Sequence, residues 1–283
     1  MMAGGTPGLG AGPLRLERIR LVSADPEILA RYFTAALGFS RTTSTRPSVD
    51  QRTTFGTHGV SLSLGAQALD LVGFDRPGRP YPDDVPGWSP LFQHIAIVVS
   101  DMAAAFARLS ATPGWRPIST AGPERLPAAS GGVSAFKFRD PEGHPLELLA
   151  FPAGHEPETW RGGGPDPCLG IDHSAISVVD SAASLAFYEG LGFSVASRST
   201  NVGPEQARLD GVPDPRVAVT GLRPPGAPTP HVELLDYAGL FPRAGHICGD
   251  HDIAATVLVF AGEASVAGPR RLQDPDGHRL WLP

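Results

Sequence analysis

Apolar and polar positions recur along the chain in a pattern that predicts several copies of one structural unit. Two apolar, β-branched strands are predicted at residues 93–100 and 172–179. Each contains a histidine, His94 or His173, that stands seven residues before an aspartate. A third segment, residues 18–25, has the same spacing, with Arg18 in the place of the histidine. A repeat of this kind organises a whole fold, so we take it as the frame for the rest of the chain.

A helix is predicted directly after each of these strands. The aspartate that closes each strand is a good N-cap residue, because its side chain accepts hydrogen bonds from the first free N–H groups of a helix. The predicted helices cover residues 27–37, 102–109 and 181–190, and each is followed by a glycine and an aromatic residue.

The last strand of each copy carries an acidic residue. Asp70, Glu147 and Glu233 are each followed four positions later by an aromatic residue, and an even spacing places both on one face of a strand. A turn, Asp140 to His144, leads into the second of these strands, and the same turn returns at Asp274 to His278. The second occurrence marks a fourth, shorter copy.

The copies predict an α+β fold with a definite domain organisation. We expect a flexible tail at residues 1–13 and a linker at residues 152–168, because both are rich in glycine or proline. Between and after them lie two predicted halves, residues 14–151 (modules 14–74 and 91–151) and residues 169–283 (modules 169–237 and 250–283, the last truncated).

Composition and charge exclude several classes of protein. The formal charge of -6 is spread along the chain without a basic stripe, so nucleic acid is not an expected partner. No apolar run approaches the roughly 20 residues that cross a bilayer, so we expect no membrane segment and a cytoplasmic location. The two cysteines, Cys168 and Cys248, indicate neither a disulfide framework nor a thiolate zinc site.

In these motifs the chain resembles the vicinal oxygen chelate superfamily, which includes glyoxalase I, bleomycin-resistance proteins and extradiol dioxygenases. The resemblance implies tandem βαβββ modules that form two cup-shaped mixed β-sheets with flanking helices. It also implies that metal ligands come from the first and last strands of each module. Four residues match those positions with ligand side chains: His94, Glu147, His173 and Glu233. The other four positions are assigned to Arg18, Asp70, Asp252 and Trp281.

The ligand set depends on which modules share a cup. Pairing in chain order leaves both cups incomplete, because a guanidinium beside a divalent ion costs Coulomb energy and an indole offers no ligand atom. Crossed pairing of the second module with the third, which the resemblance permits, collects two histidines and two glutamates. This donor set suits one divalent ion, with zinc, nickel, cobalt, manganese and iron all open.

The resemblance further implies an isomerase, epimerase or lyase. In such enzymes a metal-stabilised enediolate forms on a small hydroxy-carbonyl substrate, and Glu147 or Glu233 is expected to move the proton. Three alternatives stay open: an iron-dependent extradiol-type dioxygenase, a metal-free antibiotic-binding protein and, least favoured, a thiol transferase. The partner is a small-molecule substrate, and four modules in one chain fit a monomer or a homodimer.

The remaining charged residues receive structural expectations. His144 and His278 belong to the repeated turn, so we expect them to stabilise it. His231 shares a strand face with Glu233 and is expected to contact Glu233 without binding the metal itself. Arg18 and Asp70 are expected to form an ion pair in the second cup.

Overall fold

The structure is a computed structural model that describes residues 13–42, 58–240, 248–262 and 268–283. The tail predicted for residues 1–13 lies, apart from its last residue, outside these ranges. Within the described ranges, no helix has both the length and the apolar character needed to span a membrane.

The first two modules follow the predicted order of strands and helices. The first module contains β1 (Arg15–Val22), α1 (Pro26–Leu37), β2 (Ser40–Arg41), β3 (His58–Leu64) and β4 (Gln67–Gly73). The second module contains β5 (Gln93–Val99), α3 (Met102–Ala111), β6 (Arg116–Pro117), β7 (Glu124–Arg125), the short 3-10 helix η1 (Ala128–Ser130), β8 (Ser134–Arg139) and β9 (Pro145–Ala150).

The third module is enlarged and the fourth is reduced. A short 3-10 helix, η2 (Glu158–Trp160), precedes the third module, which contains β10 (Cys168–Ser177), α4 (Ser181–Gly190), β11 (Ser194–Val202), α5 (Pro204–Asp210), β12 (Arg216–Arg223) and β13 (His231–Tyr237). The fourth contains β14 (Val257–Ala261), β15 (Arg270–Gln273) and β16 (Arg279–Leu282), and its described residues include no helix.

The predicted N-caps hold the three repeated helices. In the first turns of α1 and α4, Asp25 and Asp180 each accept hydrogen bonds from two backbone N–H groups, and in α3 Asp101 accepts one. These bonds satisfy donors that a helix cannot satisfy within itself. At the other end of α1, Gly38 adopts a left-handed conformation with φ of 76°, which favours glycine.

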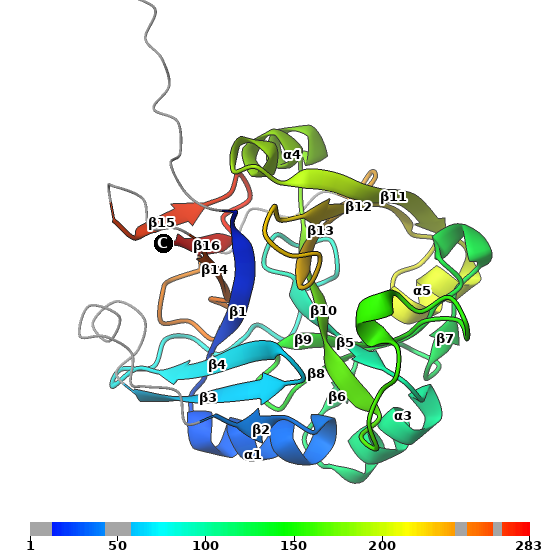
Figure 1. Cartoon of the computed structure of the whole chain (residues 1–283), viewed down its shortest axis with the longest axis horizontal. Helices are drawn as coiled ribbons and strands as arrows, with labels where there is room; N and C mark the ends of the chain where they lie inside the picture. Colours follow the sequence, from blue (N-terminus) through cyan, green and yellow to red (C-terminus); the bar gives the residue numbers. More distant parts are fainter. Residues whose placement is uncertain (1–12, 43–57, 241–247, 263–267) are drawn as a thin grey trace, which may run out of the picture.

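Two mixed sheets form the body of the molecule, and each joins modules from both halves of the sequence (Figure 1). The larger sheet has the order β11-β12-β13-β10-β5-β9-β8-β6, with β7 also paired to β8. The smaller sheet has the order β15-β16-β14-β1-β4-β3-β2. The predicted pairing of the second module with the third is therefore present, since antiparallel β5 and β10 form the centre of the larger sheet.

The apolar core lies on one face of each sheet and leaves the other face for chemistry. In β5, Ile95, Ile97 and Val99 belong to the main hydrophobic cluster, which also includes residues of α1, α3 and the smaller sheet. Because side chains alternate along a strand, His94 must point to the opposite face. The cup face of the larger sheet is therefore where the predicted ligands should meet.

Candidate metal centre

Four neighbouring strands of the larger sheet each contribute one of the predicted ligand residues. The order β13-β10-β5-β9 places Glu233, His173, His94 and Glu147 on successive strands. Registers bring them to one level of the sheet. On β5, Ala96 is paired with both His173 and Glu147, while Ala175 on β10 is paired with both His94 and Glu233.

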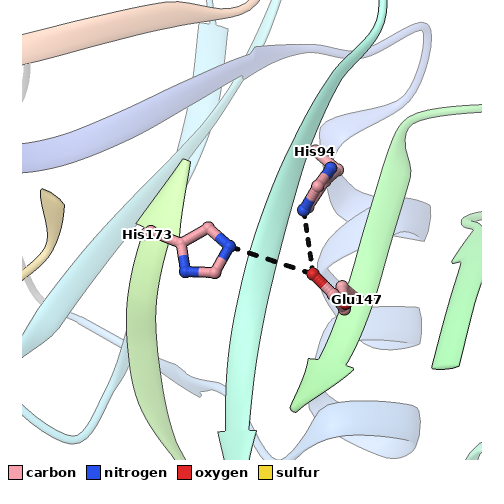
Figure 2. Close-up of side chains that lie close together, drawn as sticks. All are labelled: His94, Glu147 and His173. Carbon is pink, nitrogen blue, oxygen red and sulfur yellow. Dashed lines mark hydrogen bonds and ion pairs between the residues drawn. The ribbon is translucent and has the colours of Figure 1, made fainter. Parts of the chain in front are cut away.

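The side chains converge at the centre of the cup face. His94 Nε2 lies 2.9 Å from Glu147 Oε2, and His173 Nε2 lies 3.8 Å from the same oxygen (Figure 2). Ligand atoms of these three buried residues all lie within 4.8 Å of one another. Glu233 Oε2 is 3.5 Å from His173 Nε2, so it joins the cluster from its other side.

A second group of residues holds His173 in place. Asp172 Oδ2 lies 3.0 Å from His173 Nδ1, and the indole N–H of Trp160 donates to the other oxygen of Asp172 at 2.9 Å. A carboxylate on Nδ1 leaves Nε2 directed at Glu147 and Glu233, which is the arrangement found behind many metal-binding histidines. The motifs of the sequence did not identify Asp172 or Trp160, although an aspartate directly before a strand histidine was a signal in plain view.

His231 lies where it was expected to support Glu233. Its Nε2 is 3.5 Å from Glu233 Oε1, and its Nδ1 is 3.8 Å from Asp172 Oδ2. His231 therefore bridges the carboxylates of two neighbouring strands, since β13 runs beside β10 with His231 opposite His173.

Buried charge is concentrated in this cluster. Burial lowers the pKa of His173, but Glu233, Asp172 and Glu147 outweigh it and raise that pKa to about 9. Burial instead dominates at His94, whose pKa is lowered. One imidazole is thus surrounded by three carboxylates, and buried carboxylates of this density require a cation.

Lys137 and Asp210 form a buried ion pair beside the ligands. Lys137 is directly opposite Glu147 in the register of β8 and β9, and its Nζ lies 2.7 Å from Asp210 Oδ1. Asp210 also accepts hydrogen bonds from Gln206 Nε2 at 2.7 Å and from the Tyr237 hydroxyl at 3.0 Å. Burial raises the pKa of Glu147, but Lys137 and the two histidines outweigh burial and the net pKa is lowered. This carboxylate is therefore held ionised. Lys137 was missed, although a lysine between Phe136 and Phe138 is unusual in an apolar strand.

The donor set fits a divalent metal ion. Two imidazole nitrogens and carboxylate oxygens converge in a buried site, and this mixture suits borderline ions such as zinc, nickel, cobalt, manganese or iron. The three carboxylates supply negative charge that such an ion would neutralise. His94 Nδ1 has no hydrogen-bond partner among the described residues, so this ring is positioned by its strand and by Phe92, whose ring centre lies 5.8 Å away.

The smaller sheet forms the second cup, and there one predicted residue position was wrong. The first strand of the fourth module was predicted to begin at Asp252, but this strand, β14, begins at Val257. Val257 pairs with Arg20 on β1 as His94 pairs with Ala175 on β10, so Val257 stands at the position of His94. Asp252 instead lies before the strand, where its carboxylate binds Arg79 at 2.7 Å. The apolar run that precedes β14 extended the strand pattern by several residues, and no N-cap aspartate marked where the strand should end.

The other positions of the second cup agree with the sequence. Trp281 pairs with Val259 as Glu147 pairs with Ala96, so the indole stands at the position of an acid. The expected ion pair is present, with Arg18 Nη1 3.3 Å from Asp70 Oδ1. Arg18, Asp70, Val257 and Trp281 do not form a metal-binding set.

The repeated turns carry their histidines as structural residues. His144 is buried, with Nδ1 2.8 Å from Asp140 and Nε2 3.0 Å from the carbonyl oxygen of Val22. His278 Nε2 makes the matching contact with the carbonyl oxygen of Ser177 at 3.0 Å. Each turn therefore connects one sheet to the other.

Comparisons with known proteins agree with this architecture. Glyoxalase I from Zea mays has 16% sequence identity and a TM-score of 0.56, with 95% of this chain and 92% of that chain covered. A putative dioxygenase from Bacillus subtilis has 14% identity and a TM-score of 0.59, with 96% and 85% covered. At these identities the likeness shows the fold, which is the predicted α+β, glyoxalase-like arrangement. No curated protein sequence matches the chain significantly.

A family model confirms the predicted resemblance. Residues 15–148 match the model of the Glyoxalase/Bleomycin resistance protein/Dioxygenase superfamily, so this part of the chain is similar to that superfamily. The matched residues cover the first two modules, which lie in different sheets.

Proposed function

We propose that the chain is a divalent-metal-dependent enzyme that isomerises, epimerises or cleaves a small hydroxy-carbonyl compound by carboxylate proton transfer. The observation that carries this proposal is the buried convergence of His94, His173 and Glu147, with Glu233 at its edge. The similarity of residues 15–148 to a superfamily that includes glyoxalases supports it.

His94, Glu147 and His173 would hold the ion, with Glu233 as a fourth ligand that can leave it to move a proton. When bound, a divalent ion supplies a Lewis acid that polarises a carbonyl group and stabilises the negative charge that develops on its oxygen. The protein residues fix the geometry of this site through the strand register and through Asp172.

The two glutamates have different surroundings, which suggests different roles. The Glu147 side chain is 8% exposed and is held between His94 and Lys137, so we assign it an anchoring role. The Glu233 side chain is 20% exposed and touches His231, so it has room to reach a substrate. We assign Glu233 Oε1 or Oε2 as the atom that removes a proton from the carbon next to the carbonyl group.

Exchange of substrate protons with solvent tests this assignment. Proton NMR in D2O would follow exchange into a panel of small α-hydroxyketones, beginning with dihydroxyacetone. We expect Glu233→Gln to reduce exchange by about 100-fold or more while keeping its metal, because a general base contributes about 10²–10⁴-fold. We expect Glu147→Gln to lose both metal and exchange.

Glu189→Gln, on the exposed surface of α4, is the matched control and should exchange like the unmodified protein. Full exchange in both Glu147→Gln and Glu233→Gln would refute proton transfer by these residues.

One observation favours an extradiol-type dioxygenase as a second candidate. The tightest group, His94, His173 and Glu147, contains two histidines and one carboxylate, which is the ligand set of many non-haem iron oxygenases. Oxygen consumption with catechol by the iron-loaded protein would support this candidate. Its absence, together with proton exchange, would leave the isomerase or lyase.

A further inference from the structure

The second cup contains a cavity although it has no metal-ligand set. The cavity has a volume of about 340 Å³, which is at the lower end of the range of about 300–1,000 Å³ seen for small-molecule sites. Val257, at the position of His94, lies in its wall. Arg18, Asp70 and Trp281, at the other three positions, are not among the lining residues, so the cavity lies beside the place that corresponds to the candidate metal centre.

Apolar side chains form much of the wall. Val22 on β1, Val72 on β4, Phe74 and Leu280 on β16 are among its lining residues. All four are buried. A wall of this kind favours an apolar ligand body, since burying apolar surface stabilises a complex by about 25 cal/mol per Å² before the costs of association.

Arginines dominate the charged part of the lining. Three arginines, Arg20, Arg271 and Arg279, and one aspartate, Asp250, face the cavity. The Arg20 side chain is only 7% exposed, whereas that of Arg271 is 38% exposed, so one guanidinium lies deep and another near the surface. The lining thus carries more positive than negative charge.

The ion pairs around the cavity share their carboxylates. Arg20 Nη2 lies 3.4 Å from Asp70, which also pairs with Arg18 at 3.3 Å. Asp250 is likewise shared, at 3.0 Å from Arg271 and 3.2 Å from Arg279. Burial lowers the pKa of Arg20, Asp70 partly offsets this, and repulsion from Arg18 and Arg271 lowers it again. An added anion would relieve this repulsion.

We propose that this cavity is a second, metal-independent binding site for a small organic anion in which an apolar body carries a carboxylate. A guanidinium matches the two oxygens of a carboxylate with parallel donors. The valines, Phe74 and Leu280 enclose the apolar body. The proposal goes beyond the reaction assigned to the larger sheet, because it uses neither the ligand residues nor a metal ion.

Fluorine NMR with 4-(trifluoromethyl)benzoate tests the proposal on the full chain in the presence of a chelator. The neutral analogue 4-(trifluoromethyl)benzamide has the same apolar body. We expect saturable binding of the acid about ten-fold tighter than that of the amide, because a charge-assisted hydrogen bond adds about 1.4 kcal/mol or more.

Two variants locate the binding site. Arg271→Gln is near the surface and should weaken binding of the acid about ten-fold, and Arg20→Gln should do the same if its circular dichroism spectrum shows a folded chain. Arg198→Gln, on the exposed face of β11, is the matched control and should bind normally.

Several results would overturn the proposal. No saturable binding, equal binding of acid and amide, or unchanged binding in both Arg271→Gln and Arg20→Gln would each do so. Loss of binding in Glu147→Gln, with the arginine variants unaffected, would place the anion in the other cup. These binding measurements are made without metal, because the chelator removes it. Their outcome is therefore independent of whether the proposed enzymatic function is correct.

Discussion

Asp172 acts on the candidate centre through His173. Its carboxylate accepts from Nδ1 at 3.0 Å and is itself held by Trp160, which comes from the segment predicted to link the two halves. Nδ1 of His94 has no such partner in the part of the chain that the structure describes, so the two histidines are fixed in different ways. Replacement of Asp172 should therefore affect the orientation of His173 without removing any metal-ligand atom.

We expect Asp172→Asn to weaken metal binding by about 10- to 100-fold, which is typical for loss of a carboxylate behind a metal-binding histidine. Competition with a metal-binding dye would measure the dissociation constant. Asp236→Asn, three residues after Glu233 on β13 and partly exposed, is the matched control. Equal affinity in Asp172→Asn and the unmodified protein would show that this hydrogen bond does not orient His173.

The sequence predicted the four candidate ligands because they stand at repeated positions. His94 and His173 lie seven residues before an N-cap aspartate, and Glu147 and Glu233 lie four before an aromatic residue. Lys137 and Asp172 have no equivalent in a repeat. Lys137 pairs with Asp210 on α5, and Asp172 links His173 on its own strand to Trp160 on η2. Only strand register and side-chain packing, which depend on the whole fold, bring them to the centre.

The turn from Asp140 to His144 is one of two repeated turns that join the two sheets. His144 Nδ1 faces Asp140, while Nε2 faces carbonyl oxygens of Val22 at 3.0 Å and Ile253 at 3.1 Å. Both nitrogens face acceptors, so a protonated ring satisfies every contact. Burial lowers the pKa of His144, but Asp140 and the other acceptors outweigh it and the net pKa is raised.

A raised histidine pKa gives a definite pH dependence of stability. The contribution of His144 is fully present below the unfolded-state pKa of about 6.5 and is lost as pH rises through the higher folded-state pKa. We expect His144→Gln to lower the free energy of unfolding at pH 6 by about 1–3 kcal/mol, because a buried carboxylate loses its partner. Urea unfolding should show this difference shrinking as pH rises.

His155→Gln, in an exposed loop, is the matched control and should follow the unmodified protein at every pH. A difference for His144→Gln that is constant or grows with pH would contradict the protonated assignment.

The first strand of the fourth module is the element whose predicted start was wrong. The first strand of the fourth module was placed at Asp252 because an apolar run begins there, whereas the ladder begins at Val257. In the first three modules an N-cap aspartate fixes the end of the strand, and the fourth has no described helix to supply one. A short continuous apolar run does not by itself show where a strand begins, so without such a marker its start is not fixed.

At the scale of the whole molecule, the two cups are unequal because the modules cross. The larger sheet collects two histidines and two glutamates, while the smaller sheet collects Arg18, Asp70, Val257 and Trp281. The sequence indicated this crossing only through the completeness of one ligand set, since apolar patterns do not say which strands become neighbours. One metal ion per chain is therefore required.

Plasma mass spectrometry of the purified protein tests this requirement most directly. Glu147→Ala removes an expected ligand, and Arg18→Gln makes a matched change in the other cup. We expect about one divalent ion per chain in the unmodified protein and in Arg18→Gln, and a loss of that ion in Glu147→Ala. No bound metal under several supplementation conditions, or equal metal content in Glu147→Ala, would contradict the account and favour a metal-free binding protein.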